Sequence, residues 1–209
     1  MSTYYIIPCR KNSKGFKYKN RMLFEKTANE LKELKDNVIV TSDDDYIEML
    51  NDRYQFRFLR RSSDLCLDKT DIRSVLIDVV NRFSLKDEDD LVLLYLTYPE
   101  RKINDINKII KFYKINKGLS LLCKEPLIQH PYLCFFQKPE NKGQRLVDHD
   151  LYRRQDYPSC FFGSHFVAIV RVSFLKDVDK NLHNKKTIFY DLGENKLDID
   201  YEMDFLKLK

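Results

Sequence analysis

Apolar residues follow two alternating patterns along the chain: short continuous runs and longer amphipathic stretches. The short runs are rich in β-branched and aromatic residues, which predicts strands, and they cover residues 3–8, 38–41, 56–59, 91–96, 119–123 and 188–190. Between them, apolar residues recur at helical spacing, which predicts helices, over residues 22–35, 46–51, 72–83 and 103–113. This alternation predicts a single α/β domain over residues 1–209, with a three-layer, Rossmann-like arrangement and a mostly parallel sheet.

The periodicity breaks down between Lys124 and Asp156, where prolines, a glycine and alternating Phe and Leu runs replace it. So much apolar surface outside the sheet pattern would be costly in solvent. We therefore expect this segment to be an excursion that packs on a second copy in a two-fold homodimer. An irregular lid over the same subunit is the alternative interpretation.

The net charge of +5 is unevenly distributed. Cations concentrate in the first 35 residues, whereas acidic residues are dense over 43–52 and again from Asp177 onward. This favours a local pocket for a small anionic substrate over a nucleic-acid-binding stripe. No apolar run is long enough to cross a membrane. The five cysteines are scattered without a paired spacing, which indicates reduced thiols in a cytoplasmic protein and argues against a zinc site.

The first twenty residues combine a predicted strand with a cationic loop. Pro8 ends the strand, and the loop that follows has one glycine, Gly15, and six cations between Arg10 and Arg21. Such a loop at the carboxyl edge of a parallel sheet can bind phosphate through backbone N–H groups and lysines. A solvated loop has the same composition. The pattern is neither a Walker loop nor the Rossmann glycine fingerprint.

The residue pattern of this loop is distinctive. Residues 7–20 resemble the signature I-P-A-R-x-x-S-K-G-x-x-x-K-N of the acylneuraminate cytidylyltransferases, the CMP-sialic acid synthetases. Further segments resemble the same family in the same order, and they lie at residues 41–43, 61–68, 94–101, 119–123, 153–158 and 194–205. The resemblance implies a nucleotidyltransferase fold and transfer of CMP from CTP to an acidic sugar, with release of pyrophosphate.

The resemblance also implies which residues bind the nucleotide. Arg10 and Lys19 would act in catalysis, because they would hold the phosphates and offset the charge of the leaving pyrophosphate. The complete expected nucleotide-binding set is Arg10, Ser13, Lys14, Lys19, Asn20 and Arg61.

The expected acceptor pocket departs from the family pattern. Its expected residues are Tyr95, Thr97, Arg154 and Gln155. Tyr95 occupies the place of a family glutamine, and Tyr98 the place of a serine. Two phenol rings should narrow the pocket, so we expect N-acetylneuraminate to be a poor acceptor. His165 lies in an apolar run and is interpreted as a buried structural residue.

Asp198 and Asp200 are the expected metal ligands. In an extended segment, residues two apart lie on one face, so both carboxylates can reach one cation. Alone, such a pair near a chain end is usually solvated charge. With the family's tail motif around it, the pair implies a Mg²⁺ site, because this ion prefers carboxylate and phosphate oxygens.

Two alternatives to a synthetase for sialic-type acceptors remain open. One is a related nucleotidyltransferase with a different, non-sialic acceptor, since the position of the family glutamine is Tyr95. The other is a basic nucleic-acid-binding protein without catalysis. The near absence of interleaved aromatic and basic residues argues against the latter. The expected partners are thus CTP, an acidic sugar and a second copy of the chain, with no nucleic acid and no membrane.

Overall fold

The computed structural model describes residues 1–12 and 15–208. Its main sheet has seven strands in the order β3-β2-β1-β4-β8-β5-β9. Their bounds are β1 Thr3–Pro8, β2 Val38–Ser42, β3 Arg57–Arg60, β4 Asp90–Leu93, β5 Ser120–Pro126, β8 Phe161–Arg171 and β9 Ile188–Asp191. β8 pairs antiparallel with both neighbours, and the remaining pairings are parallel. The sheet is therefore mostly parallel, as predicted.

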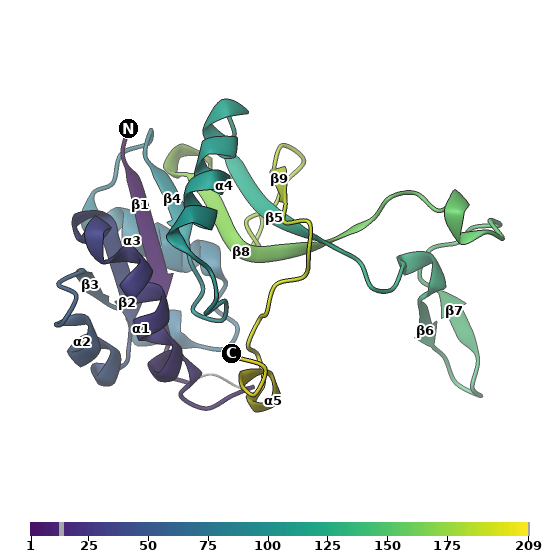
Figure 1. Cartoon of the computed structure of the whole chain (residues 1–209), viewed down its shortest axis with the longest axis horizontal. Coiled ribbons are helices and arrows are strands. Elements are labelled where there is room, and N and C mark those ends of the chain that lie inside the picture. Colours follow the sequence, from purple (N-terminus) through teal and green to yellow (C-terminus); the bar gives the residue numbers. More distant parts are fainter. Residues whose placement is uncertain (13–14, 209) are drawn as a thin grey trace.

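Helices cover both faces of the sheet (Figure 1). Their bounds are α1 Lys19–Leu31, α2 Asp45–Asn51, α3 Ile72–Phe83, α4 Ile103–Ile115 and a short α5 Glu202–Phe205. The apolar faces of α1, α2 and α4 share one core cluster with the sheet, and α3 belongs to the other. The three-layer α/β/α arrangement is thus confirmed. No described helix has the length and apolar character that a membrane crossing needs.

The predicted elements differ from the observed ones mainly at their ends. Helix α1 begins three residues early, and a 3-10 turn over Lys32–Asn37 replaces its expected last turn. The acidic run after β2 caps α2, because the Asp44 carboxylate accepts a hydrogen bond from the Tyr46 N–H. Strand β4 ends at Leu93, so the predicted strand over 91–96 was too long. All five cysteines are free in the described chain.

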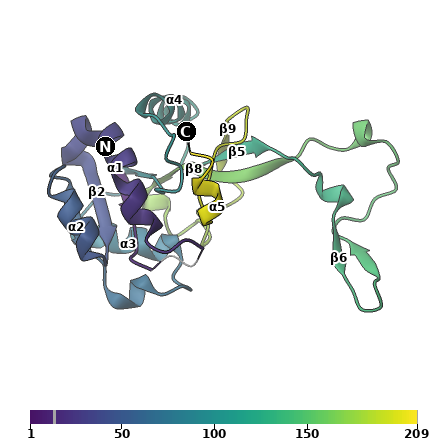
Figure 2. The same cartoon turned by 60° about the horizontal axis from the view of Figure 1, so that its bottom comes forward.

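Residues 127–160 leave the body between β5 and β8 and form an extended projection, here called the arm. It projects away from the sheet in both views (Figures 1 and 2). The arm contains a small hairpin of β6 Phe135–Gln137 and β7 Gly143–Arg145. Its large apolar side chains are exposed, among them Ile128 at 83% and Phe135 at 64%. Within the arm, the rings of Tyr132 and His149 stack with centroids 4.3 Å apart.

Candidate active site

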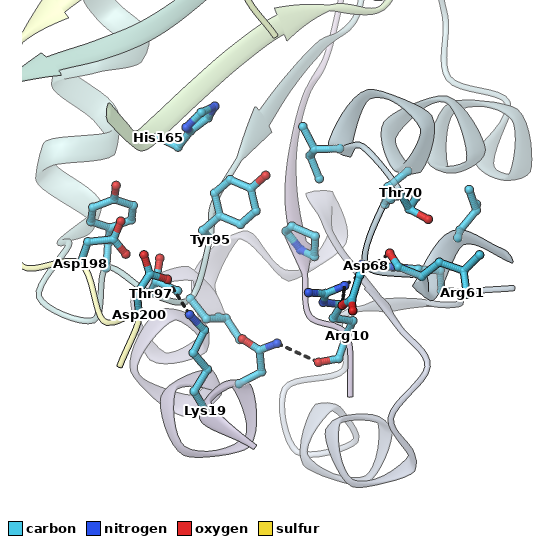
Figure 3. A pocket seen from close by; sticks show the side chains of 18 residues that line it. Arg10, Lys19, Arg61, Asp68, Thr70, Tyr95, Thr97, His165, Asp198 and Asp200 are labelled. Carbon is cyan, nitrogen blue, oxygen red and sulfur yellow. Dashed lines mark hydrogen bonds and ion pairs between the residues drawn. The ribbon is translucent and has the colours of Figure 1, made fainter. Parts of the chain in front are cut away.

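A cavity of about 410 Å³ opens at the carboxyl edge of the parallel strands. Figure 3 shows its lining side chains, which come from the loops after β1, β3 and β4, from the start of α1, from β8 and from the carboxyl-terminal tail. Eight residues predicted for the site line it together: Arg10, Lys19, Asn20, Arg61, Tyr95, Thr97, Asp198 and Asp200. The predicted nucleotide-binding residues Ser13 and Lys14 lie outside the described residues.

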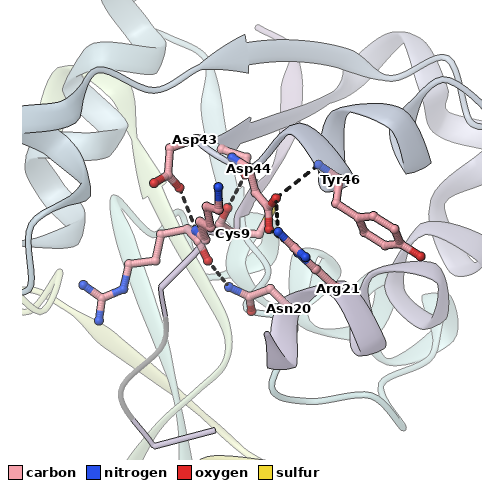
Figure 4. Close-up of polar contacts among 9 residues, drawn as sticks. Cys9, Asn20, Arg21, Asp43, Asp44 and Tyr46 are labelled. Atoms are coloured by element: carbon pink, nitrogen blue, oxygen red, sulfur yellow. Dashed lines mark hydrogen bonds and ion pairs between the residues drawn. The ribbon is translucent and has the colours of Figure 1, made fainter. Parts of the chain in front are cut away.

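The loop after β1 is held against the edge of β2 by polar contacts (Figure 4). The Ser42 hydroxyl donates to the Cys9 carbonyl at 2.5 Å, and the Lys11 N–H donates to the Asp43 carboxylate at 2.7 Å. The Asn20 amide donates to the Arg10 carbonyl at 2.9 Å. These bonds fix the backbone on both sides of Arg10. Asn20 therefore supports the loop from the first turn of α1.

An ion pair ties α1 to α2 beside this loop. The Arg21 guanidinium donates to both carboxylate oxygens of Asp44, at 2.7 and 2.8 Å. Burial opposes ionisation of Asp44, but the hydrogen bonds from Arg21 and from the Tyr46 N–H outweigh it, so the pKa of Asp44 lies below its ordinary value. The helix that carries Lys19 and Asn20 is thereby anchored to the next α/β unit.

The two predicted arginines differ in exposure and in the partners that hold them. Arg10 is partly exposed and pairs with the Asp68 carboxylate at 3.0 Å. Arg61 is buried and donates to the Thr41 carbonyl at 2.8 Å, and its burial lowers the pKa of its guanidinium. Arg10 can therefore exchange a surface partner for a phosphate, whereas Arg61 also supports the end of β2.

Lys19 is the cation that links the loop region to the tail. Its side chain is 10% exposed, and its ammonium donates to the Ile199 carbonyl at 3.0 Å and to the Asp200 carboxylate at 2.8 Å. Figure 3 shows this contact at the cavity wall. A buried ammonium with two fixed acceptors is held in one position, so Lys19 presents a preorganised positive charge.

The tail residues 198–200 run extended past the end of β4. Ile199 is fully buried, and its N–H donates to the Thr97 carbonyl at 2.8 Å. Asp198 and Asp200, on either side of it, are exposed and both line the cavity. Both carboxylates thus lie on the cavity side of the tail, while the buried Ile199 between them points away from it.

The environment of Asp198 suits a cation. Removal of its carboxylate from bulk water raises the pKa of Asp198, and the charge of Asp200 adds to this. Hydroxyl groups of Thr97 and Tyr98 and the ammonium of Lys19 oppose the rise. Among residues 1–12 and 15–208, no cluster of three or more His, Cys, Asp or Glu side chains could hold a metal. Two carboxylates would leave most ligand positions of a bound ion to phosphate and water, an arrangement that Mg²⁺ accepts.

The cationic loop and the tail also touch directly. A Cβ atom at Gly15 would lie 2.3 Å from the backbone oxygen of Asp200, so only glycine permits this approach. The rings of Phe16 and Phe205 meet edge to face with centroids 5.7 Å apart. The position of Asp200 is thus coupled to the loop that carries Arg10.

Both tyrosines after β4 line the cavity, but their surroundings differ. Tyr95 lines the cavity, and its carbonyl accepts a hydrogen bond from the buried Arg101 at 2.9 Å. The Tyr98 ring is buried against Phe166, and its hydroxyl lies 3.4 Å from the Ser164 hydroxyl and also bonds Asp198. Both rings line the cavity, and the Tyr98 hydroxyl also contacts the tail carboxylate of Asp198. That the two rings narrow an acceptor pocket stays a prediction.

One assignment is corrected, and two predicted residues lie away from the cavity of their own chain. His165 is not a buried structural residue: its ring is half-buried and lines the cavity. It lies on β8 between the buried Ser164 and Phe166. Successive side chains of a strand point to opposite faces, so the His165 side chain points to the face opposite these two. Arg154 and Gln155, expected at the acceptor, lie in a 3-10 turn of the arm and do not line this cavity.

Comparison with solved structures identifies the fold. Solved cytidylyltransferases have this fold, among them one from Leptospira borgpetersenii serovar Hardjo-bovis, with a TM-score of 0.63 and 15% identity over 97% of this chain and 83% of that one. A CMP:2-keto-3-deoxy-manno-octonic acid synthetase solved with CTP has a TM-score of 0.66 at 11% identity, over 99% of this chain and 96% of that one. The protein therefore has the nucleotidyltransferase fold.

At the level of sequence, the chain resembles the N-acylneuraminate cytidylyltransferases. It is 26% identical to the enzyme of that name from Streptococcus agalactiae serotype V, over 96% of this chain. The same identity and coverage are found with the serotype III protein. The chain spans about half the length, 51%, of these curated relatives. No profile of a known protein family matches the sequence.

Proposed function

We propose that the chain is a CTP-dependent nucleotidyltransferase that transfers CMP from CTP to a hydroxyl group of an acidic sugar and releases pyrophosphate. The observation that carries the proposal is the meeting of Arg10 and Lys19 with Asp198 and Asp200 at one cavity. The similarity to N-acylneuraminate cytidylyltransferases and the fold shared with a CTP-bound synthetase support it.

Arg10 and Lys19 would neutralise the triphosphate. Arg10 leaves Asp68, its partly exposed partner, and binds phosphate oxygens. Lys19, already fixed by Ile199 and Asp200, offers its charge without reorganising. As the bond between the α- and β-phosphates breaks, negative charge grows on the departing pyrophosphate. Cations already in place stabilise that charge more than the ground state.

Mg²⁺ is the proposed cofactor, with Asp198 and Asp200 as its protein ligands. Bound there, the ion would supply charge neutralisation at the phosphates. Tyr98 and Thr97 keep the Asp198 carboxylate oriented through their hydroxyl groups. Lys19 keeps Asp200 at the cavity wall. The acceptor would enter on the side of Tyr95.

An acceptor other than a sialic acid is the second candidate, and Tyr95 is the observation that favours it. A phenol at this place donates and accepts at a single oxygen, whereas the amide of the family glutamine donates and accepts at two separate atoms. Nucleic-acid binding is not favoured, because Arg10 and Lys19 line a cavity that also carries the carboxylates of Asp198 and Asp200, which would repel a phosphate backbone.

The nucleotide specificity tests this proposal. We expect pyrophosphate release with CTP in the presence of Mg²⁺ and an acidic sugar, and much less with ATP, GTP or UTP. Binding should be measured in parallel by thermal shift at low and high salt, because binding to a nucleic-acid backbone is steeply salt-dependent. Equal stabilisation by all four nucleotides, or a shift lost at moderate salt, would contradict a CTP site.

We further propose a two-fold homodimer built by the arm. Exposed apolar side chains such as Ile128 and Phe136, 83% and 55% exposed, need a covering surface. A second copy would supply it, and the same contact would bring Arg154 and Gln155 of one copy towards the cavity of the other. This would explain why both residues lie away from the cavity of their own chain.

Sedimentation tests the proposed dimer, and subunit mixing tests whether the arm completes the site of the second copy. The protein should sediment as a dimer at micromolar concentration. Arg154→Ala and Asp198→Asn should each be inactive alone, whereas a mixed dimer contains one intact site and should regain part of the activity. A monomer, or no recovery on mixing after exchange is verified, would rule out a shared site.

A further inference from the structure

The wall of the cavity that neither the cationic loop nor the tail occupies carries Tyr95 and His165. Tyr95 follows β4, and His165 lies on β8, the neighbouring strand. Their rings meet edge to face with centroids 5.8 Å apart. Figure 3 shows both side chains at this end of the cavity, with the tail carboxylates beside them. The two side chains thus form one continuous surface.

The imidazole of His165 is fixed by a backbone carbonyl. Its Nε2 lies 3.2 Å from the Asn181 oxygen. A carbonyl only accepts hydrogen bonds, so Nε2 carries the proton, and in the neutral ring Nδ1 becomes an acceptor. Within the described chain, Nδ1 has no hydrogen-bond partner. His165 therefore offers an acceptor at the cavity.

The carbonyl that fixes His165 is itself held by a tight turn. The Asp179 carboxylate accepts hydrogen bonds from the Asn181 N–H at 2.8 Å and the His183 N–H at 3.0 Å. These backbone bonds lower the pKa of Asp179, so its carboxylate is charged. Leu182, in the same turn, is fully buried. The ring orientation of His165 is thus determined before any ligand binds.

Tyr95 offers the complementary group. Burial raises the pKa of Tyr95 to about 12, so the phenol keeps its proton at ordinary pH. Among the described residues, its hydroxyl has no hydrogen-bond partner. The Arg101 guanidinium holds the Tyr95 backbone at 2.9 Å. A donor therefore lies on the same wall of the cavity as the acceptor of His165.

We propose that Tyr95 and His165 select the acceptor by one of its hydroxyl groups. An alcohol both donates and accepts at one oxygen, so it can satisfy Nδ1 and the phenol together. A carboxylate only accepts hydrogen bonds, so it would place a second acceptor against Nδ1. The N–H and C=O of a trans N-acyl group point in opposite directions and cannot both be met at one place. The inference rests on the proposed transfer to an acidic sugar.

Kinetics with deoxy sugars tests this pair. Acidic sugars lacking one hydroxyl at a time should be compared as acceptors with saturating CTP. For the unaltered protein, one deoxy analogue should lose roughly 10- to 100-fold in kcat/KM, since it leaves two polar groups unpaired. Tyr95→Phe and His165→Ala should weaken the parent sugar similarly and erase its advantage over that analogue. His165→Asn, which keeps an acceptor, should recover part of it.

The KM for CTP should stay unchanged in all these variants, because the pair lies away from the cationic loop. His183→Gln is the matched control, and it should keep the discrimination. Unchanged discrimination in Tyr95→Phe and His165→Ala, with the unaltered protein active, would overturn this inference alone. A defect confined to the KM for CTP would also overturn it. No transfer to any acidic sugar by the unaltered protein would instead overturn the proposed function and this inference with it.

Discussion

Replacing Asp198 by Asn is expected to abolish most turnover and to stabilise the folded chain only slightly, because the side chain is exposed. The carboxylate is a proposed metal ligand, and the amide is a poor one. Removal from bulk water raises the pKa of Asp198, so the charged form is disfavoured in the folded state. The corresponding stability is present at acidic pH and is lost as pH rises through the raised pKa. At neutral pH, Asp198→Asn removes that cost.

Asp200→Asn is expected to be equally inactive but slightly less stable. Its carboxylate is 63% exposed and pairs with Lys19, and such an exposed pair contributes at most about 1 kcal/mol. Turnover and melting temperature should be measured together, with Glu202→Gln as a tail control that makes the same charge change. Should both variants keep full Mg²⁺-dependent activity, the metal lies elsewhere.

The same residue predicts a pH dependence. Below the raised pKa of Asp198, the carboxylate is protonated and cannot bind a cation, so activity should fall with acidification at a higher pH than for an ordinary aspartate. Added Mg²⁺ competes with the proton and should shift this acid limb to lower pH. If the acid limb does not shift with Mg²⁺, the loss of activity at low pH does not arise from the metal site.

Arg10→Ala is the second change with a large expected effect. It should lower kcat roughly 10²- to 10³-fold, about 2.7–4 kcal/mol, as for loss of one donor that stabilises developing charge. The melting temperature should barely change, because the side chains of Arg10 and Asp68 are 29% and 46% exposed. Lys17→Met, a nearby exposed cation, is the control and should stay active.

Lys19→Met should also lose turnover, but with lower stability, because it leaves the Ile199 carbonyl without its ammonium partner. The contrast between Arg10 and Lys19 thus separates a free phosphate ligand from a preorganised one. Normal turnover by Arg10→Ala would refute the phosphate assignment.

Much of the site follows from local sequence patterns. The apolar run before Pro8 and the cationic residues after it place Arg10 at a strand end, and parallel strands gather such ends at one edge. The spacing of Asp198 and Asp200 gives their common face once the segment is extended. Local pattern and tertiary structure agree at these positions, and all three residues line one cavity.

What the pattern did not reveal depends on tertiary arrangement. β8 follows β5 in the chain yet inserts antiparallel between β4 and β5, and apolar content alone does not indicate strand order. This insertion carries His165 to the cavity beside Tyr95. Strand alternation was the one sequence signal for the orientation of His165, because it places this side chain opposite Ser164 and Phe166. The apolar neighbours of His165 obscured that signal. Within the arm, rings that are far apart in the sequence contact one another, such as those of Tyr132 and Tyr157, so residue spacing did not indicate the place of Arg154.

The most direct test of the central claim is identification of the product. The protein should be incubated with CTP, Mg²⁺ and a panel of acidic sugars, and the mixture analysed by mass spectrometry for a sugar joined to CMP. The proposal predicts a CMP-linked sugar acid in amounts equal to the pyrophosphate released, and none when the sugar or Mg²⁺ is omitted. Pyrophosphate release without an acceptor, or no CMP-linked product with any acidic sugar, would contradict it.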